Sequence, residues 1–196
     1  MAGQGAGMGD GSGIFPADLQ HYFGTGTTAL RTGGNIYTDI SGAGVSPVGT
    51  AADKVLSSLS ITGSTFDVAG RGIYCLAAGT FAVNANTKTI KLLFNPASAT
   101  VGSTVGASGT LISTSGAVTT SGGAWVIEGW VYKYGARASN TQLGFGKYSG
   151  GVYTVPTSPI AATATESGAI FMAVTGNAAT TNTDIVWNFF QIQAFN

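Results

Sequence analysis

The residues of this chain that could perform acid–base catalysis or hold a metal ion are few and widely spaced. There is one histidine, His21, and one cysteine, Cys75, so zinc-type clusters of Cys and His are absent from the sequence. No two carboxylates lie within four residues of each other, so there is no acidic calcium loop. The sequence therefore predicts neither a metal nor a cofactor. The eight carboxylates are Asp10, Asp18, Asp39, Asp53, Asp67, Asp184, Glu128 and Glu166.

Two of these carboxylates are the best candidates for enzymatic chemistry. Glu128 and Glu166 could form a glycosidase pair if folding brought their distant segments together. The competing interpretation makes Glu128 a hydrogen-bonded strand residue and Glu166 a loop residue. His21 is expected to lie on the solvated face of a short helix, where nothing suggests a general base. We favour the second interpretation, which predicts that the protein is not an enzyme.

Three other features of the sequence do not indicate chemistry either. The glycine-rich start is not a phosphate loop, because no strand precedes it and no Gly-Lys-Ser/Thr follows. Cys75 lies in the strand-like run 73–76, which predicts a buried and inert thiol. Asp67 and Arg71 are expected to form a local ion pair in a turn.

Charged residues are unusually scarce along the whole chain. Eight Lys or Arg and eight Asp or Glu make up 8% of the residues, against roughly 25% in ordinary soluble proteins. A free monomer with so little charge would have poor colloidal stability, which favours a surface buried in an assembly. No basic excess is available to neutralise phosphates, which disfavours nucleic acid as a partner. The most apolar run, residues 169–174, is far shorter than the ~20 residues of a membrane helix, so no membrane association is expected.

The first 50 residues are predicted to form an extended Gly-rich arm with one short amphipathic helix at about residues 16–23. Pro16 can occupy the first helical position, and Gly24 follows the last. The helix would place four apolar side chains on one face. That face could pack on the chain's own domain or against a partner. The expected partner-binding residues of the arm are Phe15, Leu19, Tyr22, Phe23, Ile36 and Tyr37.

Residues 51–196 are predicted to be one all-β domain, a jelly-roll β-sandwich of about 8–10 strands. In the run 88–94, Ile90, Leu92 and Phe94 alternate with polar residues, which indicates a half-buried strand. An immunoglobulin-type sandwich is disfavoured, because the Cys…Trp…Cys spacing is missing. Further strands are expected at residues 125–134, 142–148, 169–174 and 184–195.

Several of these predicted strands are apolar on both faces. In 125–134, Trp125, Ile127 and Val131 share one face, while Val126, Trp130, Tyr132 and Tyr134 share the other with Glu128. In 184–195, strict alternation places Ile185, Trp187, Phe189 and Phe195 on one face and Val186, Phe190 and Ile192 on the other. Two apolar faces need more cover than one two-sheet sandwich supplies. We therefore expect self-association, as a homotrimer.

The domain also resembles a group of small β-rich virion proteins of tailed bacteriophages. The resemblance spans about residues 53–196 and is carried by turns and core strands, so it concerns the fold and transfers no catalytic residue. It implies a jelly-roll module that serves as a capsid cement or decoration protein, or as a knob on tails and fibres. The stretches that carry it are 66–74, 86–96, 123–128, 166–170, 174–177 and 183–189.

These observations together predict a non-enzymatic virion structural protein. The leading hypothesis is a capsid decoration protein, made in the host cytoplasm, that trimerises on the capsid exterior and binds the major capsid protein through its arm. The alternative is a tail or head-fibre knob that binds a host-surface glycan. In that case exposed aromatic residues such as Trp130, Tyr148 or Tyr153 would stack on sugar rings.

Overall fold

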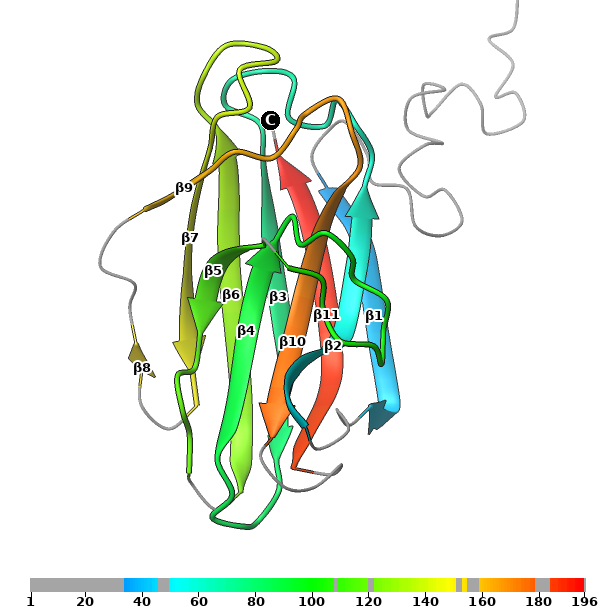
Figure 1. Cartoon of the computed structure of the whole chain (residues 1–196), viewed down its shortest axis with the longest axis vertical. Helices are drawn as coiled ribbons and strands as arrows, with labels where there is room; N and C mark the ends of the chain where they lie inside the picture. Colours follow the sequence, from blue (N-terminus) through cyan, green and yellow to red (C-terminus); the bar gives the residue numbers. More distant parts are fainter. Residues whose placement is uncertain are drawn as a thin grey trace, which may run out of the picture.

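Two antiparallel β-sheets face each other in this protein (Figure 1). The computed structural model describes residues 34–45, 50–107, 109–119, 122–150, 153–154, 159–178 and 184–195. For residues 34–45, 50, 51, 153 and 154 it describes the backbone only. The predicted helix at residues 16–23 lies outside this part of the chain. The structure confirms the expectation of an all-β sandwich.

Seven strands form the larger sheet, in the order β1-β11-β3-β6-β7-β8, with β9 also paired to β7. These strands are β1 (Gly34–Val45), β3 (Gly72–Phe81), β6 (Gly123–Lys133), β7 (Gln142–Ser149), β8 (Tyr153–Thr154), β9 (Ile160–Ala162) and β11 (Ile185–Phe195). The smaller sheet, in front in Figure 1, has the order β2-β10-β4-β5. Its strands are β2 (Thr50–Ile61), β4 (Lys88–Phe94), β5 (Thr110–Thr114) and β10 (Ile170–Ala178).

The core lies between the two sheets and follows the alternation of the sequence. β4 has the bounds predicted from the sequence, and its Ile90, Leu92 and Phe94 are fully buried. On β6, Trp125 and Val131 are fully buried as well, as predicted. Burial of each such side chain contributes about 1.5–3 kcal/mol, so the inward faces of the strands hold the sheets together.

Glycines on the inner face of the larger sheet let β4 and β5 of the smaller sheet approach closely. A Cβ on Gly129 would lie 2.5 Å from Leu92 Cδ2, and one on Gly144 would lie 2.4 Å from Ile112 Cδ1. One on Gly146 would lie 2.4 Å from a backbone oxygen of its own sheet and 2.9 Å from Ser113 Cβ. Side chains at these positions would push the sheets apart. With Gly144 and Gly146 on the inner face, Leu143 and Phe145 of β7 lie on the outer face.

The faces predicted for the last strand were wrong beyond its middle. Ile185 and Trp187 point into the core as expected, but a register shift lies between Trp187 and Phe189. A bulge inserts one residue and reverses the alternation after it. Phe190 and Ile192 are therefore fully buried, although strict alternation placed them on the other face from Trp187.

The first described strand lies within residues that the sequence analysis assigned to the arm. The backbone of β1 pairs with β11 from Gly34, opposite Ala194, to Val45, opposite Trp187. Ile36 lies at a register shift of this pairing, and Tyr37 lies opposite Ile192. The sandwich therefore begins before residue 51, and both of these residues belong to its edge strand. Phe15, Leu19, Tyr22 and Phe23 lie outside the described residues.

Candidate functional site

Five aromatic residues gather on the outer face of the seven-stranded sheet. Because side chains alternate along a strand, the neighbours of the buried residues on β3, β6, β7 and β11 point away from the core. In the register of the sheet, Trp130 lies directly opposite Tyr74 on one side and Phe145 on the other. We call this cluster the aromatic face. It consists of Tyr74, Trp130, Tyr132, Phe145 and Phe195.

The rings of the aromatic face touch one another in a continuous chain. Phe145 stacks on Trp130, with centroids 5.0 Å apart and planes 13° apart, and also on Tyr132, at 6.0 Å and 8°. Tyr74 packs against Trp130 at 5.0 Å, and Phe195 packs against Tyr132 at 4.9 Å. Both Trp130 and Tyr132 are nearly parallel to the Phe145 ring. The five rings therefore form one contiguous cluster.

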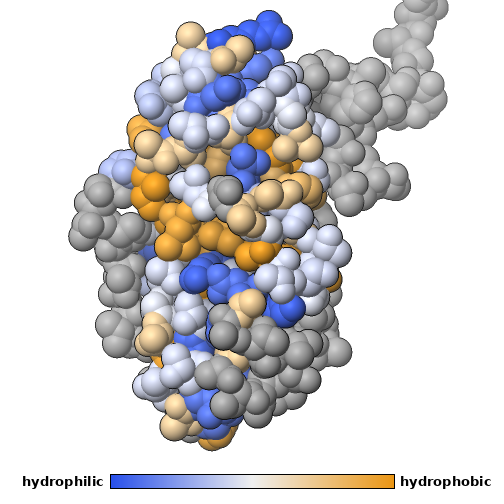
Figure 2. Space-filling model, in the orientation of Figure 1, coloured by the Kyte–Doolittle hydropathy of each residue, from blue (hydrophilic) through white to orange (hydrophobic). Residues whose placement is uncertain are grey.

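All five rings keep part of their surface exposed, and Phe145 is the most open, at 38%. None of the described strands lies over them, because all belong to the two sheets. The outer face of the smaller sheet differs, since the segment after β4 crosses it. There Val55 N donates to Ser103 O, and Ala99 is buried with Val55 and Ala173. Figure 2 shows an apolar band across the middle of that second face.

The charges beside the aromatic face neutralise each other. Glu128 and Lys147 form an ion pair of 3.0 Å, and Lys147 Nζ lies 5.8 Å from the centre of the Trp130 ring. The Tyr74 hydroxyl donates to Glu128 Oε2 at 2.8 Å. Burial and this hydrogen bond raise the pKa of Tyr74 well above its ordinary value. The face therefore presents apolar surface with one satisfied ion pair at its border.

Glu128 and Glu166 do not form the glycosidase pair. Glu128 lies on the outer face of β6, whereas Glu166 binds Lys133, which points inward from the end of the same strand. Lys133 is about 16 Å along the strand from Glu128. Within the part of the chain that the structure describes, no three His, Cys, Asp or Glu residues are grouped to hold a metal. The same described residues contain no helix long and apolar enough to cross a membrane.

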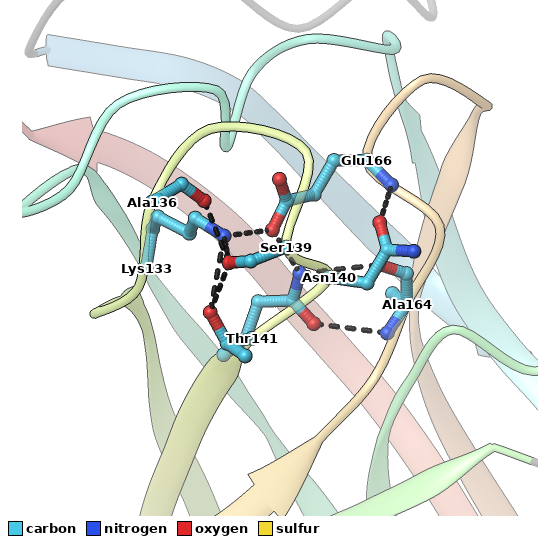
Figure 3. A network of polar contacts seen from close by, with 8 residues as sticks. Lys133, Ala136, Ser139, Asn140, Thr141, Ala164 and Glu166 are labelled. Atoms are coloured by element: carbon cyan, nitrogen blue, oxygen red, sulfur yellow. Dashed lines mark hydrogen bonds and ion pairs between the residues drawn. The ribbon is translucent and has the colours of Figure 1, made fainter.

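Glu166 instead belongs to a buried polar network at one end of the sandwich (Figure 3). Its Oε1 accepts from Lys133 Nζ at 2.5 Å and from Gln142 Nε2 at 2.8 Å. Lys133 Nζ also donates to Ser139 Oγ at 2.7 Å and to Thr141 Oγ1 at 3.1 Å. The sequence analysis missed this network. The one sequence signal for it was the alternation of side chains along the strand. Lys133 lies two residues after Val131 and therefore points inward with it.

A second buried lysine is the first residue of β4 and binds the loop that precedes this strand. Lys88 Nζ donates to Asn84 O at 2.9 Å and to Asn86 O at 3.0 Å. The carboxylate of Asp184 accepts from the side-chain amides of both asparagines, at 2.6 Å and 3.0 Å. Lys88 and Asp184 are both fully buried. These bonds tie the loop to the start of β11.

Of the remaining sequence predictions, two are confirmed, one is wrong and one concerns a side chain that the structure does not describe. Cys75 is fully buried, and Asp67 forms an ion pair with Arg71, both as predicted. Tyr148 is buried, with 3% of its surface exposed, so the suggestion that it stacks on sugars was wrong. Tyr153 lies in β8, where only the backbone is described. Of the two suggested sugar-stacking residues whose side chains are described, Trp130 lies on the aromatic face.

No protein-family model, no curated protein and no solved structure matches this chain.

Proposed function

We propose that this protein is a non-enzymatic structural component of a tailed-bacteriophage virion that trimerises and decorates the capsid as a cement protein. The observation that supports this most is the aromatic face, an apolar surface of the sandwich that none of the described strands covers. A chain with 8% charged residues gains most from covering such a surface with a second copy. No paired catalytic carboxylates compete with this interpretation among the described residues.

The proposal includes a jelly-roll topology. Along the chain, β1 to β4 alternate between the larger and the smaller sheet. Of the last two strands, β10 lies between β2 and β4 in the smaller sheet, and β11 lies between β1 and β3 in the larger sheet. This gives the strand orders β1-β11-β3-β6 and β2-β10-β4-β5. Two interleaved Greek keys of four strands would produce the same orders. β7, β8 and β9 then extend the edge of the larger sheet beyond β6.

The aromatic face is the proposed contact between subunits. Its four strands lie about 4.8 Å apart, and alternate residues lie about 6.8 Å apart, so it covers a few hundred Å². Apolar patches of this size on soluble proteins mark interaction sites. Aromatic side chains are also enriched in interface cores, because they bury a large area at little entropic cost. The arm, through Phe15, Leu19, Tyr22 and Phe23, is the proposed contact with the major capsid protein.

The second candidate is a tail or head-fibre knob that binds a host-surface glycan. An exposed tryptophan beside Glu128 and Lys147 favours it, because sugars stack on aromatic rings and bond to charged groups. The ring geometry weighs against it. One face of Trp130 carries Phe145, while Tyr74 and Lys147 also lie against the ring. A sugar needs a free ring face, whereas a protein partner can pack on ring edges.

Two variants test the proposed subunit contact. Phe145 and Leu111 are each 38% exposed, on the larger and the smaller sheet respectively. We expect F145R to convert the trimer to monomers in sedimentation equilibrium, because it would bury an unpaired charge. L111R is the matched control and should remain trimeric. Monomers of the unchanged protein, or a trimer of F145R as stable as that of the control, would contradict the contact.

The place in the virion is tested by copy number. Quantitative mass spectrometry of purified particles gives the ratio of this protein to the major capsid protein. A ratio close to one is expected for a decoration protein. A few copies per particle would indicate a tail or fibre component, and specific binding on a glycan array would then support the second candidate.

A further inference from the structure

In the buried network of Figure 3, the Glu166 carboxylate joins the Lys133 amine at the end of β6 to the Gln142 carboxamide at the start of β7. Lys133 and Gln142 lie directly opposite each other in this pair of strands, and both side chains point inward. All three groups are buried, with Lys133 at 1%, Gln142 at 0% and Glu166 at 3% exposure. Such groups are rare in protein interiors, and they are rarer still in a chain with so few charges.

We propose that Lys133 and Gln142 react with each other to form an intramolecular isopeptide bond, with Glu166 as the proton carrier. The nucleophile is Lys133 Nζ, and the electrophile is the side-chain carbonyl carbon of Gln142. The cross-link would join β6 to β7 below the loop of residues 134–141. This inference does not depend on the proposed function, because it concerns only the chemistry of the buried site.

Glu166 is placed to serve both nitrogens of this reaction. Its Oε1 lies 2.5 Å from Lys133 Nζ, the attacking nitrogen, and 2.8 Å from Gln142 Nε2, the leaving nitrogen. One oxygen can therefore take a proton from the first and deliver it to the second. The other oxygen, Oε2, is buried without a hydrogen-bond partner among the described residues.

The surrounding groups hold both reactants in place. Ala164 N donates to Gln142 Oε1 at 2.9 Å, so it polarises the carbonyl and would stabilise the negative charge that develops on this oxygen. Gln142 Nε2 also donates to Ala164 O at 3.1 Å, which fixes the plane of the amide. After Lys133 gives up one proton, its other two can remain on Ser139 and Thr141. These two bonds and the bond to Glu166 Oε1 hold Nζ beside the oxygen that also accepts from Gln142 Nε2.

The reaction balances without any further reactant. The Lys133 ammonium passes a proton to Glu166, and the neutral amine attacks the Gln142 carbonyl carbon to form a new C–N bond. Glu166 returns the proton to Nε2, and a second proton follows the same route from Nζ. The bond between the carbonyl carbon and Nε2 breaks, and ammonium leaves. The product is a secondary amide, and Glu166 ends as a carboxylate. Burial slows hydrolysis of the product because it excludes water.

Mass spectrometry of the full-length protein tests the proposal directly. We expect the intact mass, measured after denaturation, to be lower than the sequence mass by one ammonia molecule. Trypsin cuts after Arg137, which lies between the two residues. The bond would therefore hold peptide 92–137 to peptide 138–147, with Lys133 uncut. An unreduced mass with separate peptides would overturn the proposal, as would ammonia loss mapped to any other residue.

A pair of variants tests the role of Glu166. E166Q removes the proton carrier and should abolish the linked peptide in protein that is folded by circular dichroism. E128Q is the matched control, because Glu128 also pairs with a lysine between β6 and β7 but lies on the outer face. It should link as completely as the unchanged chain. Full linkage in folded E166Q would contradict the assignment of Glu166.

One further measurement needs no variant. Protein recovered from denatured inclusion bodies should begin unlinked and lose ammonia as it refolds, because only the folded site brings the three groups together. A linked fraction that stays at zero after complete refolding would overturn the proposal even if E166Q proved unable to fold.

Discussion

At the scale of single residues, burial decides the chemistry of the few reactive groups in this chain. Cys75 is fully buried on β3, and this burial raises the pKa of its thiol well above the ordinary value. The sequence predicted this outcome, because Cys75 lies in the strand-like run 73–76. Glu166 lies in a turn between β9 and β10, as predicted, but the sequence did not predict that its side chain is buried. A loop carboxylate gives no sequence signal that a lysine 33 residues earlier will meet it in the core.

The thiol of Cys75 should make stability depend on pH above about 8.5. In the folded state the thiol stays protonated, whereas in the unfolded state it ionises, so the unfolded state binds fewer protons. The free energy of unfolding should therefore fall by up to about 1.4 kcal/mol per pH unit between pH 8.5 and 10. Urea unfolding at several pH values measures this slope. The C75A variant should lose it, and an unchanged slope in C75A would refute the linkage.

At the scale of strands, alternation predicts burial only where the register is regular. β4 has the predicted bounds and faces, and its pairing with β10 is regular over its whole length. β11 deviates because its bulge after Trp187 reverses the alternation, and a bulge leaves no clear signal in a run of apolar residues. In β7 the sequence separated Leu143 and Phe145 from Gly144 and Gly146 but could not tell which pair faces inward. The side chains of β5 decide this, because they fill the space beside the glycines.

The packing of β5 on the glycines of β7 predicts a specific coupling. A Cβ at Gly144 would meet Ile112 Cδ1 at 2.4 Å, while its next neighbour, Trp130 O, is 3.6 Å away. We expect G144A to destabilise the protein by about 1–3 kcal/mol through overpacking. I112V removes the clashing methyl group and should cost about 0.5–1.5 kcal/mol alone.

The double variant decides whether this contact is responsible. G144A with I112V should be less destabilised than the sum of the single changes by at least about 0.5 kcal/mol in denaturant unfolding. G168A is the control, since a Cβ there would meet nothing nearer than 3.7 Å, and it should change stability by less than about 0.5 kcal/mol. Additive effects of the two changes would show that the destabilisation has another source.

At the scale of the whole molecule, the two sheets have unlike outer faces. The smaller sheet is covered in part by its own chain, through Ala99 and the bonds of the segment after β4 to β2. The aromatic face of the larger sheet has no such cover from the described strands. The sequence indicated a second apolar face on residues 125–134, but it could not show that the rings of β3, β7 and β11 join it. That grouping depends on strand order, which is a property of long-range pairing.

Because β1 begins at residue 34, a deletion can remove the residues proposed to bind the capsid without removing any described strand. Deletion of residues 1–33 leaves every described strand intact, so the melting temperature and the trimer should be retained, while co-sedimentation with shells of the major capsid protein should be lost.

Deletion of residues 1–47 removes β1 as well and exposes the backbone edge of β11. Each kcal/mol lost lowers the melting temperature by about 2–4 °C in a protein of this size. We therefore expect the longer deletion to melt several degrees lower and to aggregate. Equal stability of the two deletion variants would mean that β1 does not hold the edge of the sheet. Binding of the 1–33 deletion variant to shells would place the capsid contact in the sandwich itself.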